Sequence, residues 1–182
     1  KNPRSTVATV TEIYDYLRLL YARIGEIYCP NHHEKIESSS ISQIVDAIML
    51  MPERSRIQIV APIVKDKKGT HKKLIDKLIK DGYIRFKIDG ELYEVGDIPE
   101  LDKNKKHSIS VIIDRIVIKE GIETRLADSL ETSLNLSNND LVEIDDVKEE
   151  TTQLFSTKYS CKHCDFTLGD LEPRIFSFNN PQ

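Results

Sequence analysis

The chain has 182 residues and a mass of 20.9 kDa, long enough to bury a hydrophobic core without disulfide staples. Hydrophobic residues make up 39% of it and charged residues 31%, which excludes overall disorder and is typical of a globular protein. No apolar run approaches ~20 residues, so the sequence predicts no membrane span. The net charge of −4 argues against nucleic-acid binding by the whole surface but allows local basic patches.

The N-terminus lacks the apolar stretch of a signal peptide, and the chain contains three cysteines, an odd number. Both features favour a reducing, cytoplasmic location and metal ligation over a disulfide framework. The sequence begins with Lys1 rather than with Met, so we expect a piece of a longer protein.

The first segment predicts a helical N-terminal flank. Apolar residues recur at helical spacing over residues 6–25, which gives this helix one apolar face. A short knuckle at residues 28–33 follows. Ser40 with Gln43 three residues later is a capping box, and it predicts the start of the next helix.

An Ile- and Val-rich strand is expected over residues 56–64, and a basic turn at 65–69 leads into a helix at 70–81. Residues 83–88 alternate as a strand. Ile84, Phe86 and Ile88 are expected on its apolar face, with Tyr83, Arg85 and Lys87 on the other.

Asp89-Gly90 predicts a tight hairpin turn, with residues 92–95 as the returning strand. The longest strand, 107–119, has apolar residues on both faces, as a central strand does, and alternation places Arg115 on the face of Ile109, Val111 and Ile113. A helix over 120–136 and strands over 141–144 and 153–159 complete the chain. The fold class is therefore α+β, with a mixed or antiparallel sheet and packed helices.

Two short motifs contain every cysteine of the chain. Cys29-x-x-His32 and Cys161-x-x-Cys164 each place two ligands on one tight turn, and together they supply the four ligands of a structural zinc site with no open position. His33 could replace His32, although the spacing favours His32. The alternatives are a buried free thiol at Cys29 and a redox pair at Cys161 and Cys164.

The two motifs are 132 positions apart (161 − 29). A single ion that binds both joins the two ends of the intervening chain, which then forms a self-contained lobe like a domain inserted into a parent fold. We expect a zinc module at 28–36 and 158–170, and a domain at 37–157. The flanks are 1–27 and 171–182.

The sequence contains no G-x-x-x-x-G-K-[ST] loop, no G-x-G-x-x-G, no G-x-S-x-G and no H-E-x-x-H motif. Its acidic pairs lie in turns, where solvation explains them. The residues therefore favour a binding module over an enzyme.

Several long strings in the chain resemble the UvrA family, which belongs to the bacterial UvrABC excinuclease. They are NPRSTV (2–7), TEIYDYLRLL (11–20), LDKNKKH (101–107), RLADS (125–129) and LEPRIFSFNNP (171–181). The resemblance covers essentially the whole chain in order.

The resemblance implies a middle segment of a dimeric, DNA-damage-recognising ATPase of the ABC class, which loads UvrB in nucleotide excision repair and the SOS response. ATP then binds only to the longer parent, and damaged DNA is contacted through that parent. This segment is expected to be the UvrB-binding domain, joined to the parent by a zinc module. Many relatives share the mixed ligand set of Cys29, His32, Cys161 and Cys164.

In that family the interface with UvrB is polar and uses arginines of the sheet. By sequence match, Arg85 and Arg115 are the expected contacts, with Lys87 and Asp89 as weaker ones. A solvated arginine or an internal ion pair is the alternative for each arginine. For the whole chain, the runner-up function is a DNA-binding zinc module.

Overall fold

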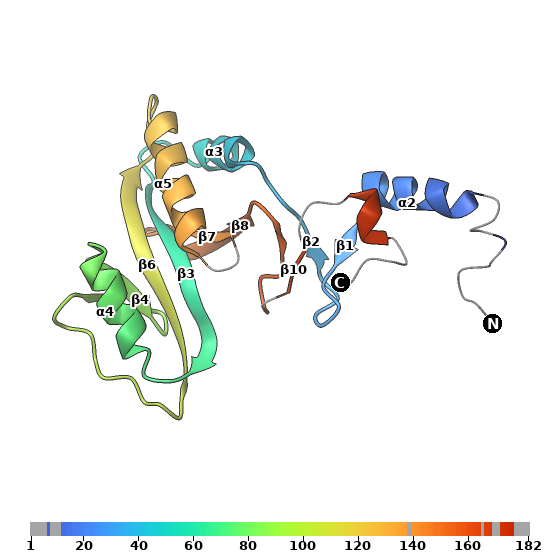
Figure 1. The fold of residues 1–182 in the computed structure, drawn as a ribbon. Helices are drawn as coiled ribbons and strands as arrows, with labels where there is room; N and C mark the ends of the chain where they lie inside the picture. Colours follow the sequence, from blue (N-terminus) through green and yellow to red (C-terminus); the bar gives the residue numbers. More distant parts are fainter. Residues whose placement is uncertain (1–6, 8–11, 138–139, 165, 169–171, 177–182) are drawn as a thin grey trace.

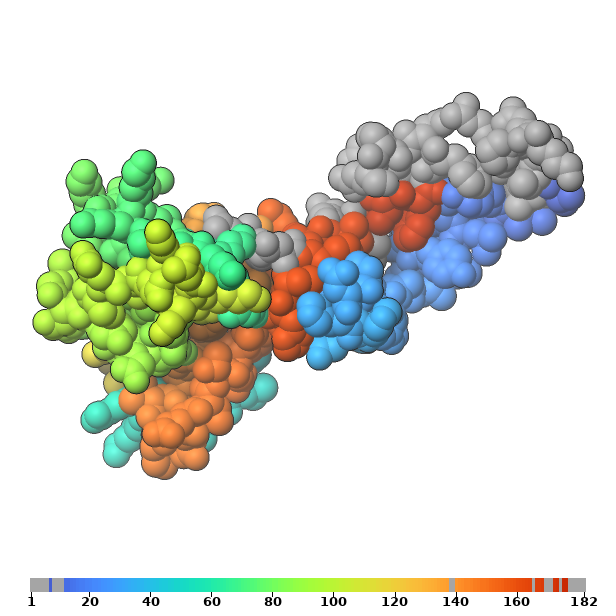
Figure 2. Space-filling view, turned by 90° about the horizontal axis from the view of Figure 1, so that it is seen from below, coloured from blue at the N-terminus to red at the C-terminus, as the bar shows by residue number. Residues whose placement is uncertain are grey.

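The structure is a computed structural model that describes residue 7 and residues 12–137, 140–164, 166–168 and 172–176. Figure 1 shows an elongated molecule with three parts in a row. They are a sheet lobe (residues 39–156), a stem of two small hairpins (27–36 and 159–168), and a helical flank in which the first helix lies beside the C-terminal turn. The space-filling view in Figure 2 has the same order.

The helical flank consists of α2 (Ile13–Ile24) and the 3-10 turn η1 (Pro173–Phe176). Arg18 Nε donates a hydrogen bond of 2.9 Å to the carbonyl oxygen of Pro173, and the Tyr14 hydroxyl donates to that of Phe176. The apolar face predicted for this helix covers no core among the described residues, since no residue of α2 is buried. Residues 6 and 8–11 of the predicted helix lie outside the described residues, as do 171 and 177–182 of the C-terminal flank.

The sheet lobe is built on six antiparallel strands in the order β5-β4-β6-β3-β7-β8. Their bounds are β3 (Arg56–Lys68), β4 (Arg85–Ile88), β5 (Glu91–Glu94), β6 (Lys106–Val117), β7 (Leu141–Asp146) and β8 (Thr151–Ser156). The α+β class is confirmed. The basic turn predicted at 65–69 is wrong for most of its length, because β3 continues to Lys68 and pairs there with Lys106 of β6.

Three helices pack on one face of this sheet (Figure 1). They are α3 (Ile41–Met49), α4 (Lys72–Lys80) and α5 (Glu123–Leu136). The capping box of α3 is confirmed, since Gln43 N–H donates to Ser40 Oγ at 3.2 Å and Ser40 N–H donates to Gln43 Oε1 at 2.8 Å. Two apolar clusters result, one under α3 and α5 and one under α4, and Ile113 of β6 contacts both. None of the described helices is long and apolar enough to cross a bilayer.

A β-bulge in β6 decides which face Arg115 occupies. Val60 of β3 pairs with Ile112 and Ile59 pairs with Asp114, so Ile113 is an extra residue between them. The strict alternation predicted for this strand therefore fails at Ile113. After the bulge Asp114 points toward α5, while Arg115 is exposed on the sheet face that the helices leave uncovered.

The predicted inward position of Ile84 is also wrong. Ile84 precedes β4 and is 59% exposed, whereas Phe86 and Ile88 are buried as expected. The turn after β4 is confirmed: Asp89 and Gly90 have φ values of 52° and 92°, as the predicted two-residue hairpin turn requires.

Truncating the centre of the α5 contact should destabilise the sheet lobe. Leu126 is fully buried in the cluster under α3 and α5. We expect Leu126→Ala to lower the free energy of unfolding by about 2–5 kcal/mol, because the cavity adds to the lost transfer energy. Urea unfolding measures this change. Leu50→Ala is the control, since Leu50 is 86% exposed and should stay within about 0.5 kcal/mol.

Candidate metal centre and partner-binding face

Four ligand atoms from the two predicted motifs meet in the stem. One atom each from Cys29, His32, Cys161 and Cys164 lies within 4.8 Å of all the others. His32 Nδ1 is 3.5 Å from Cys29 Sγ and 3.6 Å from Cys161 Sγ, and the sulfur atoms of Cys29 and Cys164 are 3.7 Å apart. The cluster could therefore hold a metal ion.

Each pair of ligands is positioned by a small hairpin. The first is β1 (Ile27–Tyr28) with β2 (Lys35–Ile36), and the second is β9 (Tyr159–Ser160) with β10 (Thr167–Leu168). A backbone hydrogen bond closes the loop of each hairpin: Cys29 N–H donates to the Glu34 carbonyl oxygen, and Cys161 N–H donates to that of Phe166. Apart from the ligands, the buried core of the stem is Ile36, with a few partly buried neighbours. Such a small core can fold only with additional stabilisation.

The spacing of the ligand atoms fits zinc. Four ligands bound at about 2.0–2.3 Å in a tetrahedron lie roughly 3.3–3.8 Å from one another. Three of the six separations, at 3.5, 3.6 and 3.7 Å, fall in this range, and all six are within 4.8 Å. One histidine nitrogen and three thiolates are a structural donor set, and they leave no position for a substrate.

The thiols have shifted pKa values. Burial raises the pKa of the Cys161 thiol. Burial acts in the same direction on Cys29, but hydrogen bonds, first of all with His32, lower its pKa to about 6. A thiolate at neutral pH is the form that binds a metal. Asn31 Nδ2 lies 3.6 Å from Cys164 Sγ, and the backbone nitrogen of His163 lies 3.4 Å from Cys161 Sγ, so both groups can donate a hydrogen bond to a thiolate ligand.

The remaining histidines of the stem are not ligands in this geometry. His163 Nε2 lies 2.9 Å from Glu34 Oε2, and its ring centroid lies 5.3 Å from that of His32, with the two rings tilted by 45°. His33 has a φ of 56° and is exposed beside the knuckle. The prediction of His32 over His33 agrees with the placement of the four ligand atoms.

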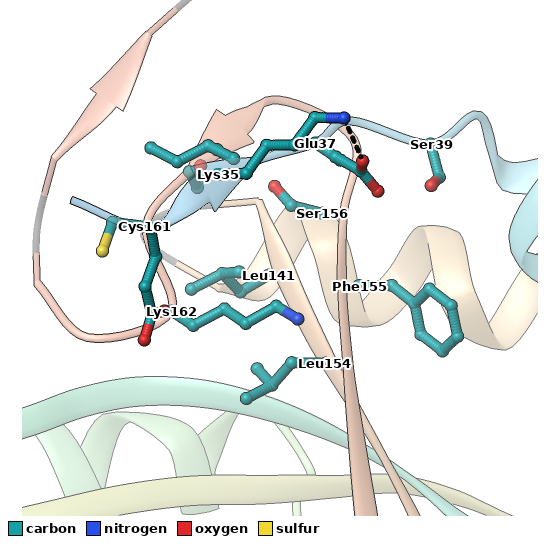
Figure 3. A pocket seen from close by; sticks show the side chains of 12 residues that line it. Lys35, Glu37, Ser39, Leu141, Leu154, Phe155, Ser156, Cys161 and Lys162 are labelled. Carbon is teal, nitrogen blue, oxygen red and sulfur yellow. Dashed lines mark ion pairs between the residues drawn. The ribbon is translucent and has the colours of Figure 1, made fainter. Parts of the chain in front are cut away.

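A pocket of about 260 Å³ separates the stem from the sheet lobe (Figure 3). Leu141, Leu154 and Phe155 line it from the sheet lobe, and Cys161 and Lys162 line it from the stem. Within the lobe, Ser39 N–H donates to the Ser156 carbonyl oxygen at 2.8 Å, which pairs the two segments that lead to the stem. Lys65 Nζ of the lobe donates to the Lys162 carbonyl oxygen of the stem. The two chain segments that connect the stem with the lobe, 36–39 and 156–159, therefore lie side by side.

The predicted partner-binding arginines lie on the uncovered face of the sheet. Arg115 is exposed, and its guanidinium makes no ion pair or hydrogen bond with any described residue. Arg85 is on the same face, because its neighbour Phe86 points into the core, and its Nε donates to Glu94 Oε1 at 3.0 Å. This pair is 38% and 67% exposed, so solvent weakens it. The alternative of an internal ion pair therefore applies in part to Arg85 and not to Arg115.

Lys87 crosses the same face toward β7. Its Nζ donates to Asp145 Oδ2 at 2.7 Å and lies 3.9 Å from Glu143 Oε2. Gln58, Lys87 and Asp145 line a shallow pocket of about 340 Å³. Burial raises the pKa of Glu143, and the positive charge of Lys87 opposes this shift only in part. The uncovered face thus combines Arg85 and Arg115 with the Glu143 carboxyl group, which the charge of Lys87 stabilises only in part.

Asp89 is held within the fold. Its Oδ2 lies 2.7 Å from His107 Nδ1, and its Oδ1 accepts the Ser108 N–H at 2.8 Å. His107 Nε2 is 3.0 Å from the Asp102 carbonyl oxygen, so a protonated ring can donate at both nitrogens. The hydrogen bond with Asp89 raises the pKa of His107. For Asp89, hydrogen bonds from His107 and Ser108 outweigh burial and lower the pKa.

This pair should make stability depend on pH. A raised His107 pKa gives a contribution that is complete below the unfolded value of about 6.5 and is lost as pH rises through the folded value. We expect the urea midpoint to fall between about pH 6 and pH 8, and to fall less in His107→Gln. If the urea midpoint depended equally on pH in the wild type and in His107→Gln, this role of the Asp89–His107 pair would be contradicted.

Sequence reasoning missed Glu143, Asp145 and His107. The sequence predicts a strand over 141–144 and places the acidic pairs, Asp145 and Asp146 among them, in turns; that placement is wrong here, because β7 continues to Asp146. His107 is predicted only as the start of a strand. Alternation along β7 could have placed Glu143 and Asp145 on one face, since Val142 and Ile144 are apolar. No signal in the sequence indicates that Lys87 reaches them across two other strands.

Comparison with known proteins identifies the sheet lobe. Residues 39–148 match the family described as the UvrA interaction domain. Over 181 residues the chain is 56% identical to UvrABC system protein A of Staphylococcus aureus and 58% identical to that of Listeria monocytogenes. The match covers 100% of this chain and 19% of each relative, so the chain spans about a fifth of their length. The chain therefore belongs to the UvrA interaction domain family.

Proposed function

We propose that this chain is a protein-docking module of nucleotide excision repair, which binds UvrB through the uncovered face of its sheet lobe. The observation that carries the proposal is Arg115, an exposed guanidinium on the uncovered sheet face that makes no ion pair or hydrogen bond with any described residue. The family description as an interaction domain supports a binding role. The relatives' name, UvrABC system protein A, supports a role beside another component of that system.

The chemistry of the face indicates what the partner must offer. Arginine presents a planar fork that pairs with a carboxylate through two hydrogen bonds, which lysine cannot do. We therefore expect carboxylates of UvrB opposite Arg115 and Arg85, and a cationic side chain opposite Glu143. Lys87 and Asp89 border the same region, and we propose them as secondary contacts.

We further propose that one zinc ion in the stem holds the sheet lobe on a longer protein. That protein would be a dimeric ABC-type ATPase that binds ATP and damaged DNA and loads UvrB in the cytoplasm. In this proposal the zinc module comprises residues 28–36 and 158–170, the UvrB-binding domain comprises 37–157, and the flanks 1–27 and 171–182 belong to the parent. The exposed apolar face of α2 supports the assignment of the first flank.

The alternative of a DNA-binding zinc module receives less support from the charges around the metal ligands. Lys35 pairs with Glu26 and Glu37, and His163 lies against Glu34. These pairs leave few unpaired cations in the described part of the stem. A phosphate-binding surface needs cations that are free to contact phosphate.

A pull-down tests the proposal. The immobilised chain, with its zinc content measured alongside, should retain purified UvrB, and added duplex DNA should not displace it. Retention of DNA in place of UvrB by the zinc-loaded chain would favour the alternative function.

A further inference from the structure

Lysines are concentrated at the end of the β3–β6 pair where β3 ends and β6 begins. We call this region the basic tip and define it as residues 65–73 and 102–107. Eight lysines lie there, all exposed: Lys65, Lys67, Lys68, Lys72, Lys73, Lys103, Lys105 and Lys106. With Asp66 and Asp102 the tip has a charge of +6 (8 − 2). Because the whole chain carries −4, all other residues together carry −10. The molecule is therefore strongly divided in charge.

The two segments of the tip form one surface. Lys67 pairs in register with His107, and Lys68 with Lys106. Figure 2, which views the molecule from below, shows the green and yellow-green segments that contain them side by side. Arg115 on the uncovered face follows Lys106 of the tip by nine positions along β6. At a rise of about 3.4 Å per residue, the two residues are roughly 30 Å apart.

Two features of the tip work against the stability of the isolated fold. Like charges directly opposite each other on paired strands repel, as Lys68 and Lys106 must. Lys72 and Lys73 begin α4, whose first turn has no acidic residue, although the dipole of a helix favours negative charge there. A fold that violates local rules in this way at one place commonly does so for a functional site.

The neighbouring carboxylates do not neutralise these lysines. Asp66 lies against the Ser108 hydroxyl, Asp102 Oδ1 accepts the Asn104 N–H, and Asp89 holds His107. Six lysines make no ion pair with any described residue: Lys68, Lys72, Lys73, Lys103, Lys105 and Lys106. The tip therefore presents positive charge that is available to a partner.

We propose that the basic tip binds the phosphate backbone of nucleic acid. Protein–protein interfaces are enriched in arginine and aromatic residues and depleted of lysine, whereas the tip contains lysines and no arginine or aromatic residue other than histidine. A membrane surface would favour apolar side chains among the cations, and the tip exposes none. Lysines on long, flexible stems suit a regular array of phosphates without base recognition. This contact goes beyond UvrB docking and uses lysines outside the proposed UvrB contacts, of which Asp89 borders the tip through its bond with His107.

Fluorescence anisotropy of a labelled duplex of about 20 base pairs tests the proposal with the zinc-loaded chain. Binding should weaken between about 50 and 200 mM salt, and log K should fall by about 0.9 per phosphate neutralised for each unit of log salt. K68E/K106E should bind at least about tenfold more weakly than the wild type at the lowest salt and show a shallower slope. Circular dichroism confirms that the variant is folded.

K119E/K148E is the matched control, because it changes the net charge equally at exposed lysines outside the tip. It should retain most of the affinity for DNA. Equal weakening by both variants, or no DNA binding by the wild type at the lowest salt, would overturn the proposal. Preferential binding of a polyglutamate peptide or of anionic phospholipid vesicles would also overturn it, in favour of a protein or a membrane. UvrB binding by K68E/K106E is expected to stay intact, so the two proposals can fail separately.

Discussion

Removal of the metal is expected to unfold the stem while the sheet lobe stays folded. The strands of the stem are two residues long, and among its described residues Ile36 is the one buried apolar residue other than the ligands. Structural zinc contributes on the order of 10 kcal/mol in small sites, more than such a core can supply. The sheet lobe, in contrast, has two apolar clusters of its own.

His32→Ala gives the sharpest form of this test, with His33→Ala as the matched control. Elemental analysis should find one zinc ion per chain in the wild type and in His33→Ala, and a large loss in His32→Ala. Amide spectra by NMR should then lose the dispersion of residues 27–36 and 159–168 but keep that of the sheet. Full zinc content in His32→Ala would refute the ligand assignment, and global unfolding would refute the independence of the lobe.

Charge reversal at Arg115 is expected to weaken UvrB binding strongly with little effect on stability. Loss of one partner of a buried interfacial charge pair costs about 2–5 kcal/mol, so Arg115→Glu should weaken binding by at least about 30-fold. The unfolding free energy should barely change, because Arg115 is exposed and its guanidinium makes no ion pair or hydrogen bond with a described residue that would be lost. Arg115→Lys should recover part of the affinity, since it keeps the charge but not the fork.

Arg85→Glu should also weaken binding, and in addition lose the pair with Glu94, which is worth at most about 1 kcal/mol in solvent. Arg23→Glu in the helical flank is the control for net charge, because it lies outside the sheet lobe. Calorimetric titrations compare the affinities of Arg115→Glu, Arg85→Glu and Arg23→Glu for UvrB. Unchanged affinity in the double variant of Arg85 and Arg115 would remove both residues from the proposed interface.

Local signals predicted much of the fold. The capping box placed α3, the hydrophobic periodicity placed α4 and α5, and the Asp89-Gly90 pair placed the β4–β5 turn. These features depend on neighbours within a few residues, which a single sequence displays directly. The metal cluster was also predictable, because two motifs of the same spacing contain all the cysteines.

Features that depend on distant partners were not predictable. The bulge at Ile113 follows from how β3 and β6 pair along their length, and it alone moves Arg115 to the uncovered face. The extension of β3 to Lys68 likewise depends on Lys106. The apolar face of α2 is typical of a core face in the sequence, yet η1 contacts it only in part, at Tyr14 and Tyr21, and no residue of α2 is buried. For the bulge and for the extension of β3, the deciding contact lies tens of residues away along the chain.

Calorimetric titration of purified UvrB into the zinc-loaded chain tests the central claim most directly. The account predicts saturable binding of one UvrB per chain, abolished or strongly weakened in Arg115→Glu and retained in Arg23→Glu. A folded, zinc-loaded wild-type chain that gives no binding signal would contradict it.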